Sequence, residues 1–130
     1  MPIERRVSPD LAPPPGYAHV AVASGRRLVL TAGGVPLDAE GNLVGAGDVA
    51  AQTRQVIANL MEQLRLGGAT PGDVLKTTVY VVATENSDLV TAWTEVRASP
   101  LAPAASTLLG VACLGYTGQL VEIEAIAALE

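Results

Sequence analysis

Two carboxylates stand two residues apart near the C-terminus, at Glu122 and Glu124. They belong to residues 120–129, LVEIEAIAAL, whose alternation predicts a strand with one wholly apolar face and both carboxylates on the other. A carboxylate that lines a pocket can act as a general base or hold a water molecule. A carboxylate on an open face is an ordinary solvated residue. The pattern alone leaves both interpretations open.

Three other side chains could do chemistry. Tyr17 and His19 stand two residues apart in a predicted strand and therefore share a face. A tyrosine there is either a packing residue with a solvated hydroxyl or a ligand contact, and we interpret the lone histidine as structural. Cys113 has no histidine near it in sequence, so we expect no nucleophilic role. With one histidine and one cysteine, the sequence predicts no zinc site.

The composition predicts one domain that self-associates. A chain of 130 residues is long enough for one hydrophobic core. It is 49% hydrophobic but has no Phe, one Trp and three Tyr, so the core is built from small aliphatic residues. So much aliphatic surface on a short chain indicates burial between subunits.

The charge argues against nucleic acid as a partner. The net charge is -5, and the eight basic residues are spread in ones and twos rather than gathered in a stripe. No stretch approaches the length of a membrane span, and no apolar run follows the N-terminal charges. A single cysteine fits a reducing compartment. We therefore expect a cytoplasmic protein that binds neither nucleic acid nor a membrane.

The first half of the chain predicts short strands and one long helix. Residues 1–15 form an extended, proline-rich lead-in to a single domain. Residues 17–24 and 27–31 are predicted to pair as a hairpin, and residues 35–44 to form a small turn between extended pieces. The apolar spacing of residues 48–66 predicts an amphipathic helix, with Asp48 as its N-cap and Gly67 at its end.

The second half predicts a central strand at 74–82, a helix, and strands at 105–112 and 120–129. Asn86 or Ser87 is expected to cap the helix, which runs to Ala98; its predicted buried side comprises Leu89, Val90, Trp93 and Val96. The prolines in SPLAP end it. The order βββαβαββ predicts an α+β fold with helices on one face of the sheet.

Several segments in fixed order resemble the RidA/YjgF family. They are the helix AAQTRQVIANL, the strand KTTVYV preceded by GDV, the terminal EIEAIA, the GY at Gly16 and the TAGG segment from Thr31. The resemblance runs from about Gly16 to the end. It implies a chorismate-mutase-like α+β fold: a mixed sheet with two helices on one face, assembled as a homotrimer with a ligand cleft between neighbouring subunits.

The resemblance also implies a chemistry. Active members hydrolyse reactive imines and enamines to a 2-keto acid and ammonia without a metal or cofactor. Carried over by position, Glu122 is the residue that positions the attacking water. Tyr17 falls on a catalytic tyrosine, and Gly33 on a glycine whose backbone N–H faces the ligand.

Three positions depart from the family pattern. Ala105 stands where active members have an arginine that binds the substrate carboxylate, Ala32 where they have a serine, and Thr91 where they have an asparagine. The chain thus resembles branches that lack this arginine. Ser106 and Thr107 remain as hydroxyl donors beside it. Residues 105–109 supply no other cation, so a 2-imino acid is expected to bind on the order of 10²-fold more weakly without the bidentate contact.

Three functional hypotheses follow. The first is a small-molecule hydrolase of the imine or enamine type, or a relative that acts on a neutral or amide-like substrate. In it Glu122 holds the water, and Tyr17 and the backbone N–H of Gly33 orient the ligand. The second is a trimeric ligand-binding protein without chemistry. The third, disfavoured by the acidic charge, is an endoribonuclease or translation inhibitor.

Overall fold

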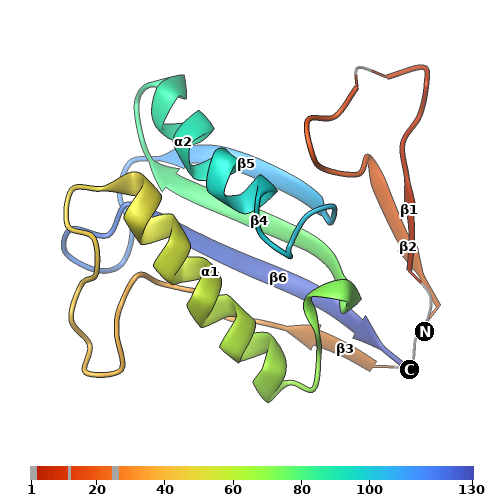
Figure 1. Ribbon diagram of the computed structural model, residues 1–130, viewed down its shortest axis with the longest axis horizontal. Coiled ribbons are helices and arrows are strands. Elements are labelled where there is room, and N and C mark those ends of the chain that lie inside the picture. Colours follow the sequence, from red (N-terminus) through yellow and green to blue (C-terminus); the bar gives the residue numbers. More distant parts are fainter. Residues whose placement is uncertain (1–2, 12, 25–26) are drawn as a thin grey trace.

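The computed structural model describes residues 3–11, 13–24 and 27–130 (Figure 1). In these residues the chain order is strand, strand, strand, helix, strand, helix, strand, strand, as predicted, with a short 3-10 helix before the fourth strand. The elements are β1 (Ile3–Arg6), β2 (Val20–Ala23), β3 (Arg27–Leu30), α1 (Val49–Leu66), η1 (Pro71–Asp73), β4 (Val74–Val82), α2 (Asn86–Arg97), β5 (Ala105–Val111) and β6 (Val121–Leu129).

The main sheet has four strands in the order β3-β6-β4-β5. β4 and β5 are parallel and are joined through α2, whereas β6 runs antiparallel to both β3 and β4. The sheet is therefore mixed, and β4 is central, as expected. Both helices lie on one face of it (Figure 1), which confirms the predicted α+β architecture and leaves the other face without a helix.

Helix α1 begins and ends where the sequence predicted. The carboxylate of Asp48 accepts the backbone N–H of Ala51 at 3.0 Å and so caps the helix. At the other end the chain leaves the helix through Gly67 and Gly68, the latter with a positive φ of 82°. The buried side comprises Gln52, Val56, Leu60 and Leu64, four residues apart along one stripe.

Strand β6 has the two faces that its alternation predicted. Val121, Ile123, Ala125 and Ala127 are at most 2% exposed and pack in the core with α1. Glu122 and Glu124 are half-buried on the opposite face. The register of β6 therefore presents the carboxylates on the face that no helix covers.

The N-terminal segment corrects two expectations. Ile3–Arg6 forms β1, antiparallel to β2, within the predicted lead-in. The predicted hairpin is wrong, because β3 pairs with β6 rather than with β2; its turn, Gly25 and Arg26, lies outside the described residues. Alternation selects the face of a strand but not its partner, and the nine-residue β6 offers β3 a partner that borders the core.

The β1–β2 arm extends beyond the end of the main sheet (Figure 1). The guanidinium of Arg5 ties it down by donating to the carbonyl oxygen of Val74 at 2.8 Å and of Gly72 at 3.2 Å. Nearer the helices, the indole N–H of Trp93 donates to the carbonyl oxygen of Pro15 at 2.8 Å. Residues 17–19 are thereby held against the start of β5, where Ala18 bridges Ala105.

Two smaller expectations concern the loop before α1 and the start of α2. The turn in 35–44 is confirmed: Leu37 bridges Leu43, although neither belongs to a strand. In α2 the N-cap is Glu85 and not Asn86 or Ser87, and its side chain makes no capping bond. Val90 was predicted to be buried but is 62% exposed, because Ala92 and Val96 take the core-facing stripe of this short helix.

Candidate functional site

Glu122 is held in a fixed orientation by a buried amide. The side-chain amide of Gln119 donates to Oε1 of Glu122 at 3.1 Å and to the carbonyl oxygen of Val121 at 3.0 Å. Gln119 is itself only 3% exposed, and its amide oxygen accepts the backbone N–H of Tyr116 at 3.1 Å. The loop before β6 therefore positions the carboxylate that the sequence singled out.

Gly33 lies against this carboxylate. Residues 31–34 continue past β3 beside β6, with the N–H of Thr31 bonded to Ala125 and that of Gly34 bonded to Ile123. Among the described residues no hydrogen bond involves the N–H of Gly33, which falls between these two. A Cβ at Gly33 would overlap the side chain of Glu122. An unpaired N–H and a carboxylate thus lie side by side, a donor and a base within reach of one small ligand.

The carbonyl group before this glycine is fixed as well. Ala32 is exposed, and its carbonyl oxygen accepts from the side-chain amide of Gln63 on α1 at 3.1 Å. The methyl side chain of Ala32 adds no hydrogen-bonding group. The polar part of this site therefore consists of Glu122 and the backbone of Gly33.

Tyr80 and Glu124 extend the polar region along the same face. Tyr80 pairs with Glu122 in the β4–β6 ladder, and its hydroxyl donates to Oε1 of Glu124. This hydrogen bond, then partial burial, then the charges of Glu124 and Glu122 raise the pKa of Tyr80 above its ordinary value of 10.0. The phenol is therefore held protonated between two carboxylates.

The start of β5 divides its polar side chains between the two faces of the sheet. Ala105 pairs with Lys76 and Thr107 with Thr78 on the face without helices. Ser106 lies on the helix side, where it accepts from the hydroxyl of Thr77 at 2.8 Å. The two predicted hydroxyl contacts, Ser106 and Thr107, therefore lie on opposite faces of the sheet.

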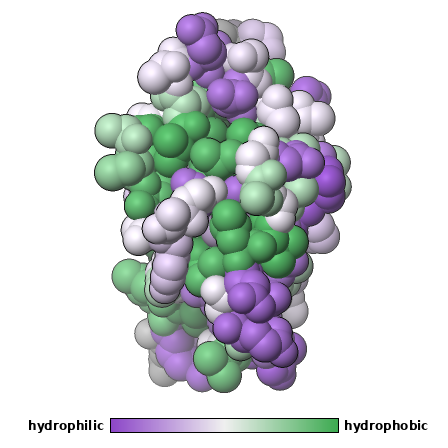
Figure 2. All heavy atoms as spheres, turned by 90° about the vertical axis from the view of Figure 1, so that its left-hand side faces the viewer, coloured by the Kyte–Doolittle hydropathy of each residue, from purple (hydrophilic) through white to green (hydrophobic). Residues whose placement is uncertain are grey.

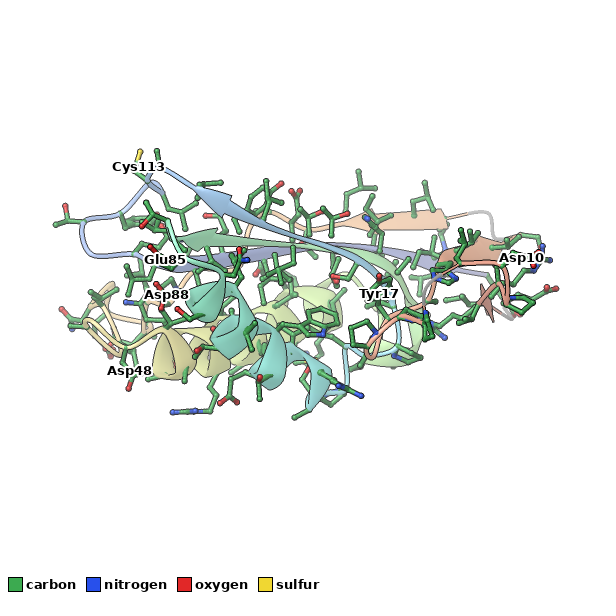
Figure 3. All side chains as sticks on the ribbon, turned by 90° about the horizontal axis from the view of Figure 1, so that it is seen from above. Asp10, Tyr17, Asp48, Glu85, Asp88 and Cys113 are labelled. Carbon is green, nitrogen blue, oxygen red and sulfur yellow. The ribbon has the colours of Figure 1, made fainter. Side chains whose placement is uncertain are left out.

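Tyr17 lies on the helix side of this edge (Figure 3). Its ring makes edge contacts with the rings of Trp93 and His19, at centroid distances of 6.1 and 6.2 Å. With Pro15, Trp93, Ser106 and Leu108 it lines a groove of about 260 Å³. Position 105 borders this groove but presents its side chain to the opposite face.

The structure does not bring the predicted site residues together within one chain. Ala105 pairs with Lys76 and Glu122 with Tyr80, so positions 105 and 122 are two strands and four residues apart. At about 4.8 Å per strand and 3.3 Å per residue, they are on the order of 16 Å apart. A small ligand cannot touch both. The chain presents two half-sites on the uncovered face of the sheet. One comprises Glu122 and Gly33, and the other comprises Ala105 and Thr107 at the start of β5.

The remaining predicted residues lie elsewhere. Thr91 is exposed on α2, and its hydroxyl donates to the carbonyl oxygen of Ser87 within the helix. His19 accepts the backbone N–H of Ser8 at Nδ1, in keeping with a structural role in the N-terminal arm. Cys113 is exposed at the far end of β5 from Tyr17 (Figure 3).

Sequence reasoning missed three polar residues with defined partners: Gln52, Lys76 and Gln119. Gln52 interrupts the apolar stripe of α1 at a position four residues before Val56, which is a signal the sequence does contain. Lys76 carries no such signal, because its partner Thr107 comes from another strand. Gln119 has partners within three residues of it, but a glutamine in a turn does not indicate by its type that its side chain is buried.

The described residues contain neither a metal-binding cluster nor a membrane-spanning helix. No group of three or more His, Cys, Asp or Glu side chains there is placed to hold a metal ion. Within the same residues, no helix combines the length and apolar character needed to cross a membrane.

Fold and site together define a small α+β protein with a fixed carboxylate on the uncovered face of its sheet. The family described as Endoribonuclease L-PSP matches residues 9–129. The crystal structure of YyfB from Yersinia pestis, a protein of unknown function in the conserved Rid family, is 38% identical and superposes with a TM-score of 0.86, covering 99% of this chain and 100% of that one. The chain belongs to the RidA/YjgF family.

Curated relatives match over shorter regions. The 2-iminobutanoate/2-iminopropanoate deaminase of Salmonella typhimurium is 41% identical over 54 residues, 42% of this chain and 41% of the relative. The 3-aminoacrylate deaminase RutC of Acinetobacter baylyi is 34% identical over 68 residues, 52% of this chain and 54% of the relative. The chain spans about half the length of the curated relatives it matches.

Proposed function

We propose that the protein hydrolyses imines or enamines in clefts between the subunits of a homotrimer. The observation that supports this most directly is the carboxylate of Glu122, which Gln119 holds beside the unpaired N–H of Gly33. In this proposal Glu122 positions a water molecule and takes its proton as the oxygen bonds to the imine carbon. Glu122 then returns this proton to the nitrogen, which gives a carbinolamine. As the C–N bond of the carbinolamine breaks, its hydroxyl group loses a proton and the nitrogen gains one, leaving a keto product and ammonia.

The names of two relatives support this reaction class. One relative is a deaminase of 2-iminobutanoate and 2-iminopropanoate, and another a deaminase of 3-aminoacrylate. An imine and an enamine are related by a proton shift, so one water-positioning carboxylate suits both. No metal or redox step is needed, because water and a proton acceptor balance the reaction.

The two half-sites support an assembly between copies of the chain. Because positions 105 and 122 are on the order of 16 Å apart in one chain, a cleft containing both half-sites must combine two subunits. Apolar surface is available for such contacts: Leu28 and Leu30 of β3 are 63% and 67% exposed on the face that Glu122 shares. Hydrophobic side chains also gather on the end of the molecule that bears the loop after β5 (Figure 2).

The test is ammonia release from 2-iminopropanoate, generated in place by an amino-acid oxidase. We expect the wild type to exceed the spontaneous rate and Glu122→Gln to lose about 10²-fold or more. Glu124→Gln is the matched control, since it makes the same chemical change two residues away on the same face, and it should stay within a few-fold of wild type. A wild type no faster than the spontaneous reaction would refute the hydrolase proposal for this substrate.

Ala105 favours a second candidate, a trimeric binding protein without chemistry, because no arginine stands at that position. This alternative predicts no turnover, and a ligand affinity that Glu122→Gln changes by no more than a few-fold. Activity in Ala105→Arg alone would indicate a cleft suited to a different ligand. The family description also names an endoribonuclease; micromolar or tighter RNA binding at about 150 mM salt would support that activity despite the acidic charge.

A further inference from the structure

Lys76 places a cation beside Ala105 on the uncovered face of the sheet. It lies on β4 directly opposite Ala105 of β5, and paired residues of neighbouring strands share a face. Its ammonium donates to the hydroxyl oxygen of Thr107 at 2.6 Å. The side chain therefore leans towards the edge strand, over the half-site at the start of β5.

The partner of this ammonium is neutral, unlike those of several other cations. Arg6 is paired with Glu4, Arg54 with Glu95 and Arg65 with Glu62, at 2.6 to 2.8 Å. Lys76, which is half-buried, instead has a hydroxyl group as its hydrogen-bond acceptor. An ammonium whose hydrogen-bond partner is neutral keeps most of its attraction for an anion.

We propose that Lys76, together with Thr107, binds the carboxylate of an anionic 2-imino or 2-keto acid in the half-site at the start of β5. An ammonium has three donors and spends one on Thr107, whose own O–H is free to donate. The two donor atoms can thus address both oxygens of one carboxylate. Ala105, which pairs with Lys76, has only a methyl group as its side chain and therefore takes up little of the face that the ligand would occupy.

This inference rests on the proposed function and names the class of substrate for the same cleft. The substrates in the relatives' names, 2-iminobutanoate, 2-iminopropanoate and 3-aminoacrylate, are all carboxylates. A protein with a net charge of -5 repels such anions unless a local cation attracts them. Lys76 is suited to that task, with the carboxylate of Glu122 contributed by the neighbouring subunit.

The experiment compares binding of 2-oxobutanoate with that of its neutral amide, measured calorimetrically without turnover. We expect wild type to bind the carboxylate at least about tenfold more tightly than the amide. Lys76→Met should abolish this preference without weakening amide binding, Lys76→Arg should keep it, and Thr107→Val should reduce it. Arg97→Met is the matched control: it makes the same change in net charge on α2, on the opposite side of the sheet, and should keep the preference.

Several results would contradict a role of Lys76 in binding the carboxylate. Equal binding of both probes by wild type, binding of neither, a preference retained in Lys76→Met, or an equal loss in Arg97→Met would overturn the role of Lys76. So would dissociation of Lys76→Met into monomers, which would make Lys76 an interface residue. Failure of the hydrolase proposal is distinguishable, because Lys76-dependent binding of 2-oxobutanoate without ammonia release would overturn only the chemistry.

Discussion

Gly33 and Glu122 are in such close contact that residue 33 has no space for a side chain. The backbone of Gly33 lies against the carboxylate, and an added Cβ would overlap the terminal atoms of Glu122. The φ angle of Gly33 is not in the left-handed region, so steric exclusion rather than backbone conformation requires glycine here. The contact joins two segments that are almost ninety residues apart in the sequence.

Gly33→Ala should therefore displace the carboxylate. We expect ammonia release to fall at least about tenfold. The free energy of unfolding should change by less than about 1 kcal/mol, because the atoms in the way are the end of the Glu122 side chain, which can move aside. Steady-state kinetics and urea denaturation measure the two effects. Gly115→Ala is the control, since a Cβ there meets no atom within 4 Å; equal behaviour of the two variants would contradict the steric argument.

Gln119→Met tests whether the buried amide positions Glu122. Methionine has a similar volume but cannot donate to Glu122 or accept from Tyr116. We expect kcat to fall about tenfold with a smaller change in KM, because the carboxylate loses its orientation while the half-site at β5 is untouched. Gln55→Met makes the same change on α1, where the lost amide contact is to Asn59 of the same helix, and should leave kcat within a few-fold. An unchanged kcat in Gln119→Met would show that Glu122 needs no such support.

Tyr80 makes the free energy of unfolding depend on pH in the alkaline range. Its pKa is raised in the folded state, chiefly by the hydrogen bond to Glu124, so the folded chain keeps the phenolic proton at a pH where the unfolded chain loses it. The resulting stabilisation is complete below about pH 10 and is lost as the pH rises through the folded-state pKa. Tyrosinate absorbance should show one tyrosine titrating later than the others. This late phase should be missing in Tyr80→Phe, and its persistence there would refute the assignment.

Gln52 connects the first turn of α1 to two loops, and its replacement should destabilise the fold. The side chain is fully buried; it donates to the carbonyl oxygens of Gly45 and Gly118 and accepts the N–H of Leu120 at 2.7 Å. Gln52→Leu leaves these backbone groups without partners, for an expected loss of about 2 to 4 kcal/mol in the free energy of unfolding. Gln55→Leu, on the same helix, should cost less than about 1 kcal/mol. Urea denaturation measures both.

The exposed residues of β3 test the oligomer. Leu30 is 67% exposed beside Ile126, and burying it between subunits would stabilise a trimer. We expect light scattering to give wild type a mass three times the 13.3 kDa of one chain and Leu30→Lys a lower one. Leu66→Lys, at the exposed end of α1, should not change the mass. A monomeric wild type would refute the trimer and leave the two half-sites unconnected.

Elements with a strong side-chain period could be predicted from the sequence. The spacing of Val56, Leu60 and Leu64 with the cap at Asp48 predicted α1 to within a residue, and the alternation around Glu122 predicted both faces of β6. These predictions succeed because side-chain period and end capping are local properties of the chain. The family resemblance singled out Glu122 and Gly33 for the same site, and the structure places them in contact.

Strand pairing and the contacts between distant polar groups could not be predicted in this way. Nothing local distinguishes β2 from β6 as the partner of β3, since any strand edge offers the same backbone donors and acceptors. Residues 105–109 contain no cation, yet β4 places Lys76 directly beside Ala105. The registers of β4 with β5 and with β6 together place Ala105 far from Glu122. Register and strand order set these distances, and both follow from packing the whole core rather than from any one segment.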